Sequence, residues 1–285
     1  MMLRSVFIGP NGVRAGWRLA AYILIAFALF RATGYLIGLA TLDDDTRWLV
    51  NEFVTFVDLV VAALIVGRFE KRSLGTYGLP WQKAFRLRFW QGAGIGFASI
   101  TLLLCALAAS GVFRFGSLAL HGGAIVQWAA IYALVFLIVG LKEEFFARGY
   151  TLYTLASGIW FWPAALITSA YFGYSHVGNS GEDLIGVANA GLFGLLFCFM
   201  LTRTGDLWLP IGFHAAWDWG ESYFYGVADS GNTLPGHLLQ PSTSGVGWLS
   251  GGSVGPEGSI LCTVVLIVIA VAFHMLFPKA VQRST

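Results

Sequence analysis

The chain has 285 residues, of which 57% are hydrophobic and only 11% are charged, and its mean hydropathy is +0.72. These values lie far from those of a soluble globular domain and indicate an all-α, polytopic integral membrane protein. The 17 basic and 15 acidic residues nearly balance, which argues against nucleic-acid binding because that function normally needs a strong basic patch.

Eight apolar stretches of the sequence are candidates for membrane-spanning helices, each of which needs about 20 mostly apolar residues. They lie near 19–42, 48–67, 90–112, 124–147, 159–176, 184–202, 207–225 and 259–277. This pattern predicts a single multi-span membrane domain over residues 1–285.

The basic residues of the short connections predict the orientation, because Lys and Arg collect on the cytoplasmic side of a membrane. Arg4, Arg14 and Arg18 precede the first stretch, and Lys279 and Arg283 follow the last, so we expect both termini to be cytoplasmic. The most basic loop follows the second stretch and contains Arg68, Lys71, Arg72, Lys83, Arg86 and Arg88. The first stretch is too long for a signal-peptide core and is expected to be retained. In a prokaryotic host, this membrane would be the plasma or inner membrane.

Glycine is concentrated at two places that affect the expected fold. The segment 226–258 is rich in Gly and Ser and is predicted to be a flexible external loop. Gly92 and Gly96, four residues apart, would let a second helix approach closely, although this spacing alone is a weak signal.

The segment from Glu143 to Arg148 concentrates charge near the end of the fourth apolar stretch. Ionisable groups are costly inside a bilayer and therefore indicate function by default. Residues four apart share a helix face, so Glu144 is placed to pair with Arg148. Glu143 is rotated by about 100° from Glu144 and stays available for another partner. Both acids could equally be interfacial charges beside Lys142, and this segment alone does not decide between the two interpretations.

Two further polar motifs lie in the apolar stretches that follow, namely Phe172-x-x-x-His176 and His214-x-x-x-Asp218. His214 and Asp218 are four apart and share one helix face. A single intramembrane His is often only a hydrogen-bond partner between helices. Three separated polar clusters in apolar regions are harder to explain as packing contacts, and they predict an intramembrane polar cavity.

Taken together, these three motifs resemble the signature of the CAAX-protease and bacteriocin-processing family of intramembrane endopeptidases, which includes the type II CAAX prenyl protease. The resemblance implies a catalytic core over 124–225, whereas the N-terminal third matches only in hydropathy. The implied active-site residues are Glu143, His176, His214 and Asp218. The implied supporting residues are Glu144, Arg148 and Phe172.

Two mechanisms are open for such a site. In a metal-free mechanism Glu143 with His176 activates water, and His214 stabilises the oxyanion. In a metalloprotease mechanism the four active-site residues are the metal ligands and bind Zn²⁺, which lowers the pKa of its bound water to about 7. The sequence has no His-Glu-x-x-His pair that would indicate zinc, so no cofactor is assigned and zinc stays open. Asp218, when ionised, only accepts hydrogen bonds and fits an orienter of His214 or a metal ligand, whereas a protonated Asp218 could donate.

Hydropathy alone places Glu143 near one end of the fourth stretch and His176 near the opposite end of the fifth. For both residues to act on one bond, the helices must tilt strongly or the fourth helix must run deeper. We expect the fourth helix to run toward Tyr150 or beyond.

The function predicted from these features is an intramembrane endopeptidase. Its partners would be the lipid bilayer and a membrane-associated or lipid-modified protein substrate. One alternative is a proton-coupled transporter in which the same residues relay protons, and another is a non-catalytic membrane scaffold with the family fold. The sequence lacks the internal repeats common in transporters, and the intact motif residues argue against a scaffold.

Overall fold

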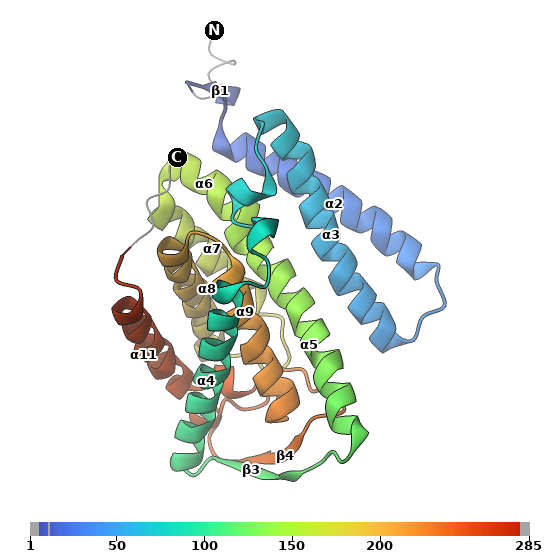
Figure 1. Cartoon of the computed structure of the whole chain (residues 1–285), viewed down its shortest axis with the longest axis vertical. Helices are drawn as coiled ribbons and strands as arrows, with labels where there is room; N and C mark the ends of the chain where they lie inside the picture. The colour runs from blue at the N-terminus through green and yellow to red at the C-terminus, as the bar shows by residue number, and fades with distance from the viewer. Residues whose placement is uncertain (1–5, 11, 280–285) are drawn as a thin grey trace.

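The computed structural model of the protein describes residues 6–10 and 12–279 and is mostly helical, as the sequence predicts (Figure 1). Its α-helices are α2 (Ala15–Gly38), α3 (Asp44–Glu70), α4 (Leu87–Ala109), α5 (Gly123–Glu144), α6 (Thr151–Ile159), α7 (Phe161–Ser175), α8 (Leu184–Thr204), α9 (Trp208–Asp218), α10 (Gly247–Ser250) and α11 (Ile260–Leu276). Two π-helical segments, η3 (Phe145–Tyr150) and η4 (Trp219–Phe224), continue α5 and α9. The strands are β1 (Ile8–Gly9), β2 (Gly12–Val13), β3 (Phe113–Leu118) and β4 (Leu239–Thr243).

The arrangement of the helices separates a peripheral hairpin from a central bundle. Helices α2 and α3 form an antiparallel pair that packs beside α5 and α6, while α4, α9, α8 and α11 gather on the other side of α5 (Figure 1). The antiparallel ribbon of β3 and β4 lies across one end of the bundle, next to the ends of α4 and α5.

Five helices of the described residues are long and apolar enough to cross a membrane. They are Ala15–Gly38, Thr46–Glu70, Leu87–Ala109, Gly123–Ile159 and Leu184–Thr204. Only 6% of the apolar part of the first helix is buried, so its side chains face outward, as they do where lipid is the surrounding solvent. These features are those of an integral membrane protein.

The other three predicted spans coincide with shorter helices, α7, α9 and α11. Of these, α7 has 15 residues, α9 has 11 before η4 and α11 has 17, fewer than the roughly 20 needed to span a bilayer unaided. The count of eight spans therefore stays a prediction. The predicted orientation, with both termini cytoplasmic, also stays a prediction. Two of the basic residues on which it rests, Arg4 and Arg283, lie outside the described residues.

The path of the chain after Glu143 explains how the fourth stretch reaches the other motifs. Helix α5 ends at Glu144, but the chain stays helical through η3 and α6, so that one apolar run extends over Gly123–Ile159. Gly149 has non-helical backbone angles (φ −83°, ψ −120°), which bend the run inside the π-helical turn. The expectation of a deeper fourth helix is confirmed.

Helices α4 and α9 pack more closely than side chains would allow. A Cβ atom on Gly92 would lie 2.0 Å from the Leu209 carbonyl oxygen, and one on Gly96 would lie 2.2 Å from that of Phe213. A Cβ atom on Gly212 of α9 would likewise lie 2.1 Å from the Phe89 carbonyl oxygen of α4. The close approach predicted from the glycine spacing is confirmed, and it fixes the position of α9, which carries His214.

The segment 226–258 contains more structure than its composition suggests. β4 pairs with β3 in antiparallel register from Phe113 opposite Thr243 to Leu118 opposite Leu239. Gly116, at φ +72°, permits the irregular register there, because a Cβ would lie 1.8 Å from the Gln240 carbonyl oxygen. The segment then forms α10 and returns toward the bundle, where it contributes side chains to the cavity described below.

We predict that Gly96→Ala destabilises the protein by about 1–3 kcal/mol, because the added methyl overlaps the backbone of α9. The matched control is Gly94→Ala on the same helix, where nothing lies within 4 Å of the added Cβ and where Ala favours the helix by up to about 1 kcal/mol. Thermal denaturation of the purified protein in detergent compares the two. Equal midpoints for both variants would contradict the tight contact.

Candidate active site

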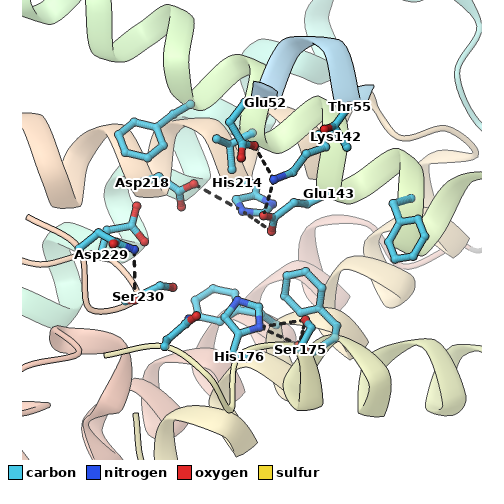
Figure 2. Close-up of a pocket in the computed structure, with 18 of the residues that line it drawn as sticks. Glu52, Thr55, Lys142, Glu143, Ser175, His176, His214, Asp218, Asp229 and Ser230 are labelled. Atoms are coloured by element: carbon cyan, nitrogen blue, oxygen red, sulfur yellow. Dashed lines mark hydrogen bonds and ion pairs between the residues drawn. The ribbon is translucent and has the colours of Figure 1, made fainter. Parts of the chain in front are cut away.

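A cavity of about 860 Å³ opens among α2, α3, α5, α7, α9 and the segment after η4. All four residues predicted for the active site line it: Glu143, His176, His214 and Asp218. Figure 2 shows Glu143 and His214 on one side of the cavity, Asp218 and Asp229 toward one end, and His176 on the opposite side. The structure thus brings the three motifs to a single space.

His214 lies at the centre of the polar contacts. Its Nδ1 is 2.9 Å from Glu144 Oε1, and its Nε2 is 3.4 Å from Asp218 Oδ2 and 3.9 Å from Glu143 Oε2. Because an ionised carboxylate only accepts hydrogen bonds, Nδ1 carries a proton. The two contacts of Nε2 are ion-pair distances and not hydrogen bonds, so a proton on Nε2 can be donated to a group in the cavity. Phe197 stacks on the ring at 5.6 Å and limits its rotation.

The pair predicted from the i, i+4 spacing, Glu144 and Arg148, is confirmed. Arg148 Nη1 donates to Glu144 Oε1 at 2.9 Å, and both side chains are completely buried. The guanidinium lies over the rings of Phe172, at 4.2 Å, and Phe197, at 5.5 Å. Such cation–π contacts stabilise a desolvated charge. Glu144 therefore joins the buried arginine to the imidazole of His214 through one oxygen.

His176 is held from its own helix end. Its Nδ1 is 2.7 Å from the carbonyl oxygen of Phe172, and its ring packs at 4.8 Å from the Phe172 ring. A carbonyl accepts only, so Nδ1 carries the proton and the neutral ring keeps its lone pair on Nε2. Phe172 thus supports both His176 and Arg148.

Glu143 has an ion-pair partner that sequence reasoning did not identify. Lys142 Nζ is 3.4 Å from Glu143 Oε1 and also hydrogen-bonds Glu52 Oε2 (Figure 2). Glu52 comes from α3, far away in the sequence, and nothing in the local pattern around it pointed to the cavity.

The comparison with protein families covers the segment that carries these motifs. Residues 125–220 match the model of the family described as type II CAAX prenyl endopeptidase Rce1-like. We call residues 125–220, which are similar to this family, the Rce1-like segment. No curated protein and no solved structure gave a significant match.

The Rce1-like segment does not supply the whole cavity. Asp229 and Glu257, from the segment 226–258, also line it, and they are the two acidic residues of that segment. Their isolation in a Gly/Ser-rich stretch was the signal that could have singled them out. Burial raises the pKa of both carboxyls, and the charge of Asp229 raises that of Glu257 further. Trp217 Nε1 donates to Glu257 at 3.0 Å and Ser230 Oγ donates to it at 3.2 Å.

The possible ligand atoms around the cavity decide whether it could hold a metal ion. Among residues 6–10 and 12–279, one group of three residues could hold a metal ion, because its possible ligand atoms all lie within 4.8 Å of one another. The group is Asp218, Asp229 and Glu257. This set shares only Asp218 with the four residues predicted to bind zinc. It offers carboxylate oxygens alone, whereas catalytic zinc sites in proteins typically include histidine or cysteine ligands. The predicted zinc ligands therefore do not form one compact set, and no reaction step is assigned to a metal.

We predict that Arg148→Met lowers the free energy of unfolding by about 3–5 kcal/mol, because it removes the buried cation paired with Glu144 and leaves that carboxylate with His214 alone. Arg86→Met, which removes an exposed arginine, serves as the control and is expected to have little effect. Thermal denaturation in detergent measures both. An Arg148→Met variant as stable as the control would show that the buried pair is unimportant to the fold.

Proposed function

We propose that the protein is a CAAX-protease-like intramembrane endopeptidase that hydrolyses a peptide bond of a membrane-associated or lipid-modified protein. One observation carries the proposal: carboxylates and imidazoles from α5, from the end of α7 and from α9 face a single cavity with largely apolar walls. These are the groups that general acid–base hydrolysis uses. The Rce1-like match over 125–220 supports the same class of chemistry.

In the proposed reaction, Glu143 is the general base. Its carboxylate takes a proton from a water molecule while the water oxygen attacks the scissile carbonyl carbon. His176 holds this water through the lone pair on Nε2, which its Nδ1 contact with Phe172 leaves free in the neutral ring. The carbonyl oxygen becomes an oxyanion and accepts a hydrogen bond from the protonated Nε2 of His214.

The proton then moves to the leaving group. Glu143 gives it to the amine nitrogen as the carbon–nitrogen bond breaks, so that the products are a new carboxyl terminus and a new amine. Asp218 and Glu144, at opposite ring nitrogens of His214, orient the imidazole and balance its charge. Glu143 thus acts first as the base and then as the acid of the proposed cycle.

The apolar wall of the cavity supports a hydrophobic substrate. Ile23, Phe27 and Phe30 of α2 and Trp48 of α3 line the cavity and are also exposed at the surface of the protein. On a helix that faces lipid, such side chains border the acyl chains of the bilayer. A lipid-modified or membrane-embedded substrate would therefore approach Glu143 from this side. We retain the cytoplasmic location of both termini as part of the proposal.

The proposal predicts that Glu143→Gln abolishes peptide-bond cleavage, because the amide cannot accept the proton of water. The measurement compares protein termini by mass spectrometry in membranes from cells that carry wild type or the variant. We expect termini that occur with wild type and disappear with Glu143→Gln. Glu182→Gln, an isosteric change at a residue that does not line the cavity, is the matched control and should leave them unchanged.

Identical termini for wild type and Glu143→Gln, with both proteins folded, would contradict the protease assignment. A transport role would then be tested by proton flux in vesicles.

Metal dependence is a separate prediction. We expect EDTA or phenanthroline to leave cleavage by the purified protein nearly unchanged, because the water is activated by Glu143 and the four active-site residues do not form a compact zinc site. Assay in metal-free detergent buffer, with Zn²⁺ added back, checks this. Loss of cleavage on chelation and its recovery with Zn²⁺ would favour the metal mechanism instead.

A further inference from the structure

The contact between Lys142 and Glu143 is unusual for residues that are adjacent on a helix. Neighbouring side chains point about 100° apart, so they do not normally meet. Here the ammonium of Lys142 is nevertheless 3.4 Å from Glu143 Oε1, while it also hydrogen-bonds Glu52 Oε2. The three side chains are only 18–27% exposed, and all line the cavity.

The two oxygens of Glu143 have different surroundings as a result. Oε1 is taken by Lys142, whereas Oε2 faces His214 Nε2 at 3.9 Å. This division fixes the plane of the carboxylate and directs one oxygen toward the reaction space. A carboxylate held in this way needs little reorganisation to accept a proton.

Charge supports the same conclusion. Among the described residues that line the cavity, Lys142 is the one lysine or arginine, whereas the acids are Glu52, Asp58, Glu143, Asp218, Asp229 and Glu257. A neighbouring cation favours the ionised form of a carboxylate, which is the form that acts as a base. Lys142 and the protonated imidazole of His214 both lie within 4 Å of Glu143 and together offset the charge of the other acids.

We infer that Lys142 is a positioning residue for Glu143 and that Glu52 of α3 holds Lys142 in place. This inference rests on the proposed function, in which Glu143 is the base. It extends the site beyond the Rce1-like segment, because Glu52 lies outside residues 125–220.

The test uses the full-length protein in detergent and a synthetic peptide that spans a cleavage site found by the comparison of termini. Lys142→Met is expected to lower kcat by at least about tenfold with KM nearly unchanged, because the reacting group is misplaced while the substrate contacts remain. Lys142→Arg, which keeps a cation, should retain most of kcat. Lys142→Gln, which keeps a hydrogen-bond donor without charge, should resemble Lys142→Met and guards against a folding failure of the latter.

Exchanging the charges of Glu52 and Lys142 tests whether Lys142 positions Glu143 or only holds α3 against α5. Glu52→Lys combined with Lys142→Glu can restore an ion pair between α3 and α5 but places a negative charge beside Glu143. We expect thermal stability to recover relative to Lys142→Met and kcat to stay low. Recovery of kcat in the swap, or a normal kcat in Lys142→Met and Lys142→Gln, would overturn the inference. A raised KM with normal kcat would also overturn it, because Lys142 would then bind substrate.

A failure of the proposed function can be told apart from a failure of the inference about Lys142. If wild type gives no cleavage that depends on Glu143, the proposed function itself fails before any Lys142 variant is measured. If wild type cleaves and the Lys142 variants cleave equally well, only the inference about Lys142 and Glu52 fails.

Discussion

The rest of the site depends on the contacts that the buried carboxylate of Glu144 makes with Arg148 and His214. Its Oε1 lies 2.9 Å from both Arg148 Nη1 and His214 Nδ1. Breaking a buried ion pair by removing one partner is strongly destabilising because it leaves the other charge uncompensated. Since the same oxygen of Glu144 also contacts His214, this contact holds α9 against the run that begins with α5. Phe172 and Phe197, which pack on the guanidinium, tie α7 and α8 to the same unit. The result is an imidazole held at the cavity wall with one nitrogen directed inward.

The remaining architecture supplies the surroundings of that unit. Close backbone contact at Gly92, Gly96 and Gly212 sets α9 against α4, and the bend at Gly149 carries the α5 run past the cavity. Elements outside 125–220 add the apolar wall and the outer charges, including Glu52. A cavity whose reactive groups come from one segment and whose walls come from others can change its substrate while it keeps its reaction.

Local spacing made some of this predictable. The i, i+4 rule was enough for Glu144 and Arg148, and hydropathy was enough for the helical segments, because both depend on residues close in sequence. Contacts between distant segments cannot be derived from such local spacing. Glu52 meets Lys142 from α3, and Asp229 and Glu257 arrive from a Gly/Ser-rich stretch that composition alone describes as a spacer. The bond between Glu144 and His214 was missed for the same reason, since only the packing of α5 against α9 creates it.

The central claim is that water, activated by Glu143, attacks the peptide carbonyl directly in this cavity. It is tested most directly by a single turnover of the purified, reconstituted protein in oxygen-18 water, followed by mass spectrometry of the product and of the protein. Direct attack predicts labelled oxygen in the new carboxyl terminus of the product and none in the peptide that contains Glu143. Label in the Glu143 side chain, or an absence of cleavage, would contradict the account.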